Sequence, residues 1–294
     1  MGTKAKSLQK QAVDYANEIH TPGVSRYEYK KENGKQYPLI SSDETKKGYT
    51  RHWVTFAKWV NGHTSHKCKT LDCARQYVDI YMQDYAKSHA QSSCAAARSA
   101  LAKLYNTTGP ELVKQAYHRP RSAIKNNRGG LRTRWERNHK DACDFARFTG
   151  LRRSELLSVR AVDYRGNGVF ELRKTDKKVQ TKGGRPRNIQ VLPQNIERIE
   201  AIIRERAALH GENSSLFQPK DVPKDAQTHQ YRSLFATEYY NHHARPLEEL
   251  TAKKIYYCRG DRKGEKFDKR AMLITTRQLG HNRIDVIARS YLRV

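Results

Sequence analysis

The sequence predicts a mainly α-helical protein of two domains, with a small antiparallel β-sheet in the second domain. Its 294 residues are more than one average domain needs. Apolar residues recur at intervals of three and four over much of the chain, which is typical of amphipathic helices. Residues 162–193 differ, because short β-branched and aromatic runs there are separated by turn residues.

The first domain is predicted at residues 43–118 as a small helical bundle. Three apolar stripes carry this prediction, at residues 49–60, 71–85 and 97–105. The first stripe follows Ser42, a good N-cap residue, and Gly62 is a helix stop signal. Residues 1–42 are polar, with tyrosines among lysines, and their pattern leaves an arm or a small strand pair open.

A basic interdomain linker is predicted at residues 119–134, where Pro120 and two adjacent glycines interrupt a run of cations. Such a run fits either a solvated surface or a segment that follows phosphates, and its position between two basic domains favours phosphates. The candidate DNA-binding residues are Arg119, Arg121, Lys125, Arg128, Arg132 and Arg134.

The second domain, residues 135–294, is predicted to begin with two helices, one on each side of Gly150. Strands are predicted at residues 162–164, 169–172 and 188–192. The remainder reads as largely helical. A polar segment at 258–268 interrupts it and fits either a hairpin or a loop.

The charge balance indicates a polyanionic partner. There are 57 Lys and Arg against 30 Asp and Glu, a net charge of +27, and both halves of the chain are basic. Nucleic acid fits better than a membrane, since no long apolar run or strongly amphipathic basic helix is present. The alternative is a soluble basic protein without a specific partner. The polar N-terminus and five cysteines without a paired framework predict a cytoplasmic, nucleoid-associated protein.

A zinc site is one interpretation of His63, His66, Cys68 and Cys73, because zinc takes histidine and cysteine ligands. The spacing matches no standard zinc knuckle, and Cys73 lies inside a helical pattern. Ordinary structural roles are therefore the favoured interpretation, and no metal or other cofactor is expected.

Five residues form an ordered set that could cleave a phosphodiester: Arg152, His229, Arg232, His281 and Tyr291. Arginine forks bind phosphate oxygens and keep their charge, so two of them could stabilise the crowded phosphorus centre. A tyrosine hydroxyl has a pKa of ~10 and needs a base or a positive site to attack. Either histidine could take its proton, and a lysine with a lowered pKa could protonate the leaving oxygen.

This order resembles the tyrosine recombinases, also called phage integrases, over about residues 43–294. The Thr-Gly-Leu-Arg run ending at Arg152, the His-x-x-Arg of residues 229–232, the Leu-Gly-His of residues 279–281 and Tyr291 match the family's motifs. Glu155 matches a supporting acid. Lys182, in a Lys-Gly-Gly-Arg-Pro-Arg turn, resembles the family's hairpin lysine, and Lys174 is a competitor.

The resemblance implies a helical, SAM-like core-binding domain and an α+β catalytic domain that form a clamp around DNA. It also implies that Tyr291 forms a 3′-phosphotyrosyl bond and releases a 5′-hydroxyl, without metal or ATP. A homotetramer on two DNA sites would be expected, with an accessory directionality factor in some settings. The leading hypothesis is an integrase or transposase of a mobile element or phage. A catalytically silent DNA-binding regulator and a type IB topoisomerase-like enzyme are the alternatives.

Three departures from the family pattern concern the nucleophile's surroundings. His281 and Tyr291 are one residue further apart than is common in the family. The stretch between Arg232 and Leu279 is long and carries the polar insertion at residues 255–270, which fits a contact to DNA or a neighbouring subunit, or a plain surface loop. Three residues follow Tyr291, so we expect either other assembly contacts or a shortened chain.

Overall fold

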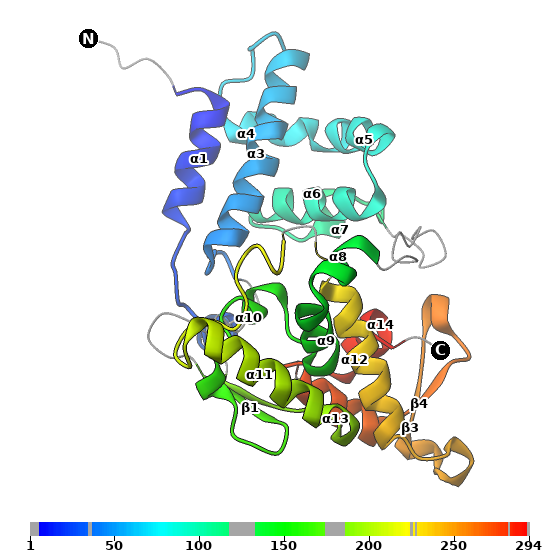
Figure 1. The fold of residues 1–294 in the computed structure, drawn as a ribbon. Helices are drawn as coiled ribbons and strands as arrows, with labels where there is room; N and C mark the ends of the chain where they lie inside the picture. The colour runs from blue at the N-terminus through cyan, green and yellow to red at the C-terminus, as the bar shows by residue number, and fades with distance from the viewer. Residues whose placement is uncertain are drawn as a thin grey trace. The chain divides into compact units, whose positions relative to one another are not determined.

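The computed structural model describes residues 6–34, 37–117, 133–173, 186–223, 226, 228–281 and 283–292. The chain divides into two compact units, Met1–Ile124 and Lys125–Val294. Both are drawn in Figure 1. Helices dominate, and the strands form two small antiparallel sheets, which confirms the predicted fold class.

The described part of the first unit is built from helices joined by loops, with one isolated β-bridge between His20 and Ile40. Its helices are α1 (Leu8–Glu18), α2 (Arg26–Asn33), α3 (Asp43–His63), α4 (Leu71–Ala74), α5 (Val78–Ser88), α6 (Gln91–Leu104) and α7 (Gly109–Leu112). Helix α3 begins as predicted, because the Ser42 hydroxyl accepts a hydrogen bond from the Thr45 N–H at 3.3 Å. It ends one residue beyond Gly62.

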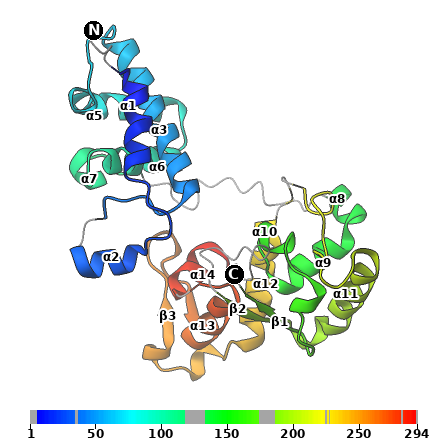
Figure 2. The ribbon, with the colours of Figure 1, turned by 90° about the vertical axis from the view of Figure 1, so that its left-hand side faces the viewer.

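The core of the first unit is centred on Trp53 of α3, which has no exposed surface. Its indole N–H donates to the Ala100 carbonyl of α6 at 2.7 Å. Leu8, Ala12 and Ala16 bury one face of α1 in the same core, and α1 runs beside α3 in both Figure 1 and Figure 2. The first 42 residues, which the sequence left open between an arm and a strand pair, therefore contribute a core helix.

The second unit combines helices with two hairpins. Its helices are α8 (Thr133–Asn138), α9 (Lys140–Thr149), α10 (Arg153–Leu156), α11 (Ile196–His210), α12 (Thr228–His243), α13 (Lys269–Gln278) and α14 (Ile284–Ser290). Strands β1 (Val169–Leu172) and β2 (Arg187–Gln190) pair antiparallel, with Leu172 opposite Arg187. Strands β3 (Ile255–Tyr257) and β4 (Lys266–Asp268) form the second hairpin, with Ile255 opposite Asp268.

Aromatic packing joins the elements of the second unit. Phe145 of α9 packs edge-on against Phe170 of β1 and against Phe217, with ring centroids 5.4 and 5.1 Å apart. All three rings are fully buried. Such a core fixes the end of α9, where the first candidate catalytic motif begins.

The strand predicted at residues 162–164 is wrong. Residues Ala161–Asp163 form a single 3-10 turn. The Asp163 carboxylate accepts the Arg160 backbone N–H at 2.9 Å and also pairs with the Arg160 guanidinium at 2.9 Å. This local side-chain bonding gives the backbone an alternative to a strand ladder. The polar segment at 258–268, left open between hairpin and loop, is part of the β3–β4 hairpin.

No helix among the described residues is long and apolar enough to cross a membrane.

Candidate active site

Among the described residues of the second unit, Arg232 is the most deeply buried cation. It has no exposed surface, and its guanidinium donates to the carbonyls of Gly150 and Leu279. These carbonyls belong to the C-caps of α9 and α13, so one side chain of α12 holds the ends of two other helices. Gly150 has a φ of +62°, and a Cβ there would lie 2.4 Å from Phe235 Cδ1. The glycine of the first motif is therefore required by backbone conformation and by space.

The surroundings of Arg232 disfavour its charged form. Burial, with the nearby charges of Arg152 and Arg187, lowers the pKa of Arg232 to about 10. The group still carries its proton at neutral pH. A guanidinium has five N–H donors, so after its contacts to Gly150, Leu279 and Tyr291 it retains capacity for a further anion. Because Arg232 has no exposed surface, any ligand could contact its guanidinium only after the side chains that cover it move.

The Glu155 carboxylate binds two arginines of the candidate site. It is fully buried and accepts the Arg152 backbone N–H at 2.8 Å, the Arg152 guanidinium at 2.9 Å and the Arg187 guanidinium at 2.7 Å. Burial works to raise the pKa of Glu155, but Arg187, the Arg152 N–H and the charges of Arg152 and Arg232 hold it below its usual range. The ionised carboxylate thus fixes both guanidinium groups in place.

Arg187 is a site residue that sequence reasoning missed. It is the first residue of β2, its side chain is 7% exposed, and it donates to the Leu279 carbonyl at 2.8 Å. It packs against Gly280, where a Cβ would lie 2.7 Å from a guanidinium nitrogen. Arg187 ends the basic Lys-Gly-Gly-Arg-Pro-Arg run that contains Lys182, and in such a run the sequence does not distinguish a buried arginine from a DNA-contacting one.

Tyr291 follows directly on α14 and reaches this cluster. Its hydroxyl lies 3.4 Å from Arg232 Nε and 3.4 Å from His281 Nε2, both longer than an optimal hydrogen bond. The Arg232 guanidinium lies 5.5 Å from the centre of the Tyr291 ring. The backbone N–H of His281 donates to the Thr276 carbonyl at 2.9 Å, which fixes the position of this residue. The phenol thus lies between an imidazole and a cation, although the tyrosine is only 8% exposed.

The structure brings together Arg152, Glu155, Arg232, His281 and Tyr291 of the predicted site. His229 lies one turn before Arg232 on α12, and its side chain is exposed. Lys182 and its competitor Lys174 lie outside the described residues, as do the linker cations Arg119, Arg121, Lys125, Arg128 and Arg132. Arg134 is the second residue of α8, but its side chain is not among those described.

The residues of the zinc alternative have other contacts. The His63 ring stacks on Trp59 with centroids 3.7 Å apart, and Cys68 is buried with its thiol on the Thr70 carbonyl. Within the described ranges, no three His, Cys, Asp or Glu side chains form a group that could hold a metal ion.

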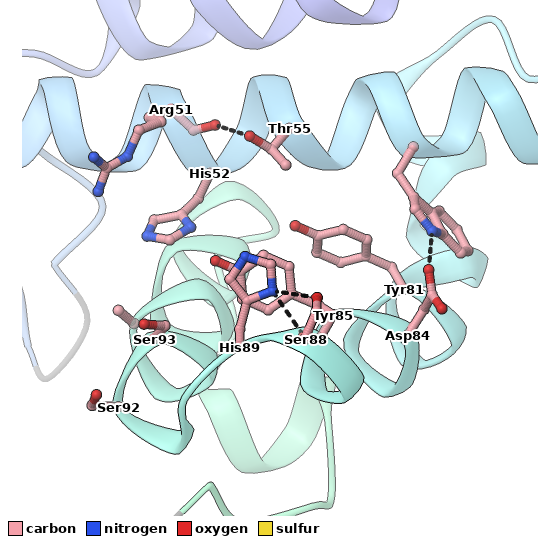
Figure 3. Close-up of a pocket in the computed structure, with 12 residues that line it drawn as sticks. Arg51, His52, Thr55, Tyr81, Asp84, Tyr85, Ser88, His89, Ser92 and Ser93 are labelled. Carbon is pink, nitrogen blue, oxygen red and sulfur yellow. Dashed lines mark hydrogen bonds between the residues drawn. The ribbon is translucent and has the colours of Figure 1, made fainter. Parts of the chain in front are cut away.

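A cleft of about 530 Å³ lies in the first unit between α3, α5 and α6. Figure 3 shows aromatic and hydroxyl side chains around it. The Trp59 indole donates to Asp84 at 2.9 Å, and the Tyr85 and His89 rings stack with centroids 3.6 Å apart. These contacts tie the cleft's walls together, and the buried Tyr81 hydroxyl has its pKa raised by burial. The cleft belongs to the first unit, and the residues of the candidate active site belong to the second.

The chain has the tyrosine recombinase fold, as similarity to solved structures shows. It matches the XerH site-specific recombinase bound to a palindromic difH substrate, with a TM-score of 0.53, 14% identity, and coverage of 97% of this chain and 90% of that chain. The XerH pre-cleavage complex matches with a TM-score of 0.52, 12% identity, and coverage of 100% and 96%. The Tn1549 transposon integrase in complex with a circular intermediate DNA matches with a TM-score of 0.48, 14% identity, and coverage of 96% of this chain and 95% of that chain.

The sequence matches no protein-family model and no curated protein. Identities of 12–14% establish the fold alone. The activity therefore has to be argued from the geometry of the site.

Proposed function

We propose that the chain is a site-specific DNA recombinase that cuts and rejoins DNA through a covalent bond between Tyr291 and a 3′-phosphate. The observation that carries the proposal is the position of the Tyr291 hydroxyl, 3.4 Å from both Arg232 Nε and His281 Nε2. A phenol between a cation and a potential base is suited to nucleophilic attack.

The proposed cleavage step transfers the phosphoryl group from DNA to the tyrosine. The Tyr291 oxygen bonds to phosphorus, its proton passes to His281, and the bond from phosphorus to the 5′-oxygen breaks. A general acid, for which the family resemblance indicates Lys182, protonates the leaving oxygen to a hydroxyl. Arg152 and Arg232 stabilise the extra negative charge on the non-bridging oxygens. Attack by a 5′-hydroxyl on the phosphotyrosine reverses these events, so the bond energy is kept and no ATP is needed.

DNA is the proposed substrate because the net charge of +27 favours a polyanion and because the XerH structures of the same fold hold difH substrates. The first unit and the basic linker would then complete a clamp around the duplex. Assembly as a homotetramer on two sites, an origin in a mobile element or phage, and action in the cytoplasm at the nucleoid belong to the same proposal.

The test uses nicked duplexes that carry the sequences the chain itself selects by binding from a randomised pool, incubated with the full chain in EDTA and analysed under denaturing conditions. The nick lets the cleaved strand diffuse away, so covalent protein–DNA adducts accumulate. We expect adducts from the native chain and none from Tyr291→Phe. Tyr257→Phe, at a tyrosine that is 50% exposed, is the matched control and should form adducts normally.

Arg232→Lys should slow adduct formation by about a hundredfold, the usual cost of one transition-state donor. The absence of adducts from the native chain would favour the silent DNA-binding regulator. Relaxation of supercoiled DNA without any joining of two sites would favour the topoisomerase alternative.

A further inference from the structure

The β3–β4 hairpin, residues 255–268 and here called the inserted hairpin, contains an arginine that is turned inward. Arg262 is only 8% exposed, whereas its neighbours Arg259 and Lys263 are exposed. Its guanidinium pairs with Glu265, donating from Nε at 2.6 Å, and lies 5.3 Å from the centre of the Phe267 ring. Glu265 and Phe267 hold the guanidinium in one orientation, so little conformational entropy is lost when its remaining N–H groups donate to another acceptor.

That third contact is the segment that carries Tyr291. Arg262 donates to the Ala288 carbonyl and, at 3.2 Å, to the Leu292 carbonyl. Figures 1 and 2 both show the hairpin beside α14. Carbonyls in the last turn of a helix lack partners within the helix, and the helix dipole favours a cation there. Arg262 therefore caps α14 at residues on both sides of Tyr291.

We propose that the inserted hairpin is an intramolecular anchor, with Arg262 as a positioning residue that keeps Tyr291 in the active site of its own subunit. This inference rests on the proposed function. It differs from a DNA-contacting or neighbour-contacting role, because the guanidinium binds Glu265, Ala288 and Leu292 of its own unit.

The anchor constrains the backbone and leaves the tyrosine ring able to move. Both anchored atoms are main-chain oxygens, and Tyr291 is the residue just before Leu292. A phosphate must displace the covering side chains to reach Arg232, which has no exposed surface. Rotation of the Tyr291 side chain can uncover Arg232 while the backbone stays in place, so the same tyrosine remains within reach of the phosphate.

Hydrogen exchange tests the anchor without depending on catalysis. Arg262→Met keeps the length and apolar stem but removes the donors, and Lys263→Met removes a charge from the same hairpin at an exposed position. We expect amides of residues 287–292 to exchange about tenfold faster or more in Arg262→Met, because a capped helix end loses its hydrogen bonds. Lys263→Met should match the native chain, and Arg262→Lys should recover part of the protection. Equal protection in Arg262→Met and the native chain would overturn the anchor.

Adduct formation on the nicked duplexes tests what the anchor does. A nucleophile displaced by about 1 Å loses up to about a hundredfold in rate, so Arg262→Met should react ten- to a hundredfold more slowly at saturating DNA while binding DNA as tightly as Lys263→Met. An unchanged or faster rate would refute the positioning role. Failure of the native chain to form any adduct would instead refute the proposed function, and the exchange result would still decide the anchor.

Mixing two inactive chains tests the subunit that supplies the tyrosine. Tyr291→Phe lacks the nucleophile, and Arg232→Gln lacks a phosphate-binding arginine. If each tyrosine serves its own subunit, the mixture forms no more adduct than the separate variants. Adduct restored by mixing would mean that Tyr291 is delivered to a neighbouring subunit and would overturn the inference.

Discussion

Replacement of Glu155 by glutamine tests the organisation of the site most sharply. Glutamine keeps the volume and one oxygen acceptor, but it removes the negative charge and turns two N–H donors toward Arg152 and Arg187. In the native chain the carboxylate accepts three hydrogen bonds within 2.9 Å and is fully buried. Breaking a buried ion pair from one side costs about 3–5 kcal/mol. We expect a loss of about 3 kcal/mol in unfolding free energy, since one acceptor remains.

The assay is urea unfolding followed by hydrogen exchange of peptides from each unit, so that only the second unit is scored. For a unit of this size the loss corresponds to a fall in Tm of about 6–12 °C. Glu238→Gln is the matched control, because Glu238 pairs with Arg147, whose side chain is 47% exposed, and should change stability by less than about 1 kcal/mol. Equal effects of the two substitutions would refute the account of Glu155 as the organiser of the arginines.

The same carboxylate has a defined pH signature. Its pKa in the folded chain lies below the ordinary value, so its stabilising effect is complete above the unfolded pKa and is lost as pH falls through the folded pKa. The unfolding free energy of Glu155→Gln should therefore fall less than that of the native chain as the pH is lowered, which urea unfolding at a series of pH values measures.

Three further predictions follow from the second unit and the overall charge. Gly150→Ala should lower the unfolding free energy by about 2–4 kcal/mol, because the backbone there is left-handed and the new Cβ would overlap Phe235. Gly166→Ala is the control: its backbone is also left-handed, but no atom lies within 4 Å of the new Cβ, so the loss should be about 1 kcal/mol. The urea midpoints of the two variants measure the difference. The hydrogen bond from Arg245 lowers the pKa of Asp268 to about 2, so the stability that this carboxylate contributes is complete above about pH 4 and is lost toward pH 2. Unfolding free energies measured between these pH values should therefore fall less steeply in Asp268→Asn than in the native chain. DNA affinity measured by fluorescence anisotropy should fall steeply with salt; a flat response would exclude a phosphate-binding clamp.

The sequence predicted those parts of the fold that depend on local patterns. The stripe at residues 49–60 lies in α3, and Ser42 caps it, because periodicity and capping are properties of neighbouring residues. The strand at residues 169–172 was confirmed for the same reason. The strand at 162–164 failed because the Arg160–Asp163 pair formed a local turn instead.

The candidate site was predictable in its residue types and only partly in its contacts. Arg152, Arg232, His281 and Tyr291 could be selected because a phosphodiester reaction needs cations, a base and a nucleophile in one place. Arg187 and Arg262 could not be selected, because 57 basic residues offer many candidates and burial separates them only after folding. Besides one carboxylate each, their partners are the backbone carbonyls of Leu279, Ala288 and Leu292, which leave no mark on the sequence.

The most direct measurement of the central claim is the mass-spectrometric identification of the tyrosine that carries DNA. Adducts formed on nicked duplexes would be digested with protease and nuclease, leaving a nucleotide on the reactive residue. The chain has 17 tyrosines, and we predict that the modification is found on Tyr291 through a 3′-phosphate. Modification of another tyrosine, or of Tyr291 through a 5′-phosphate, would contradict the mechanism.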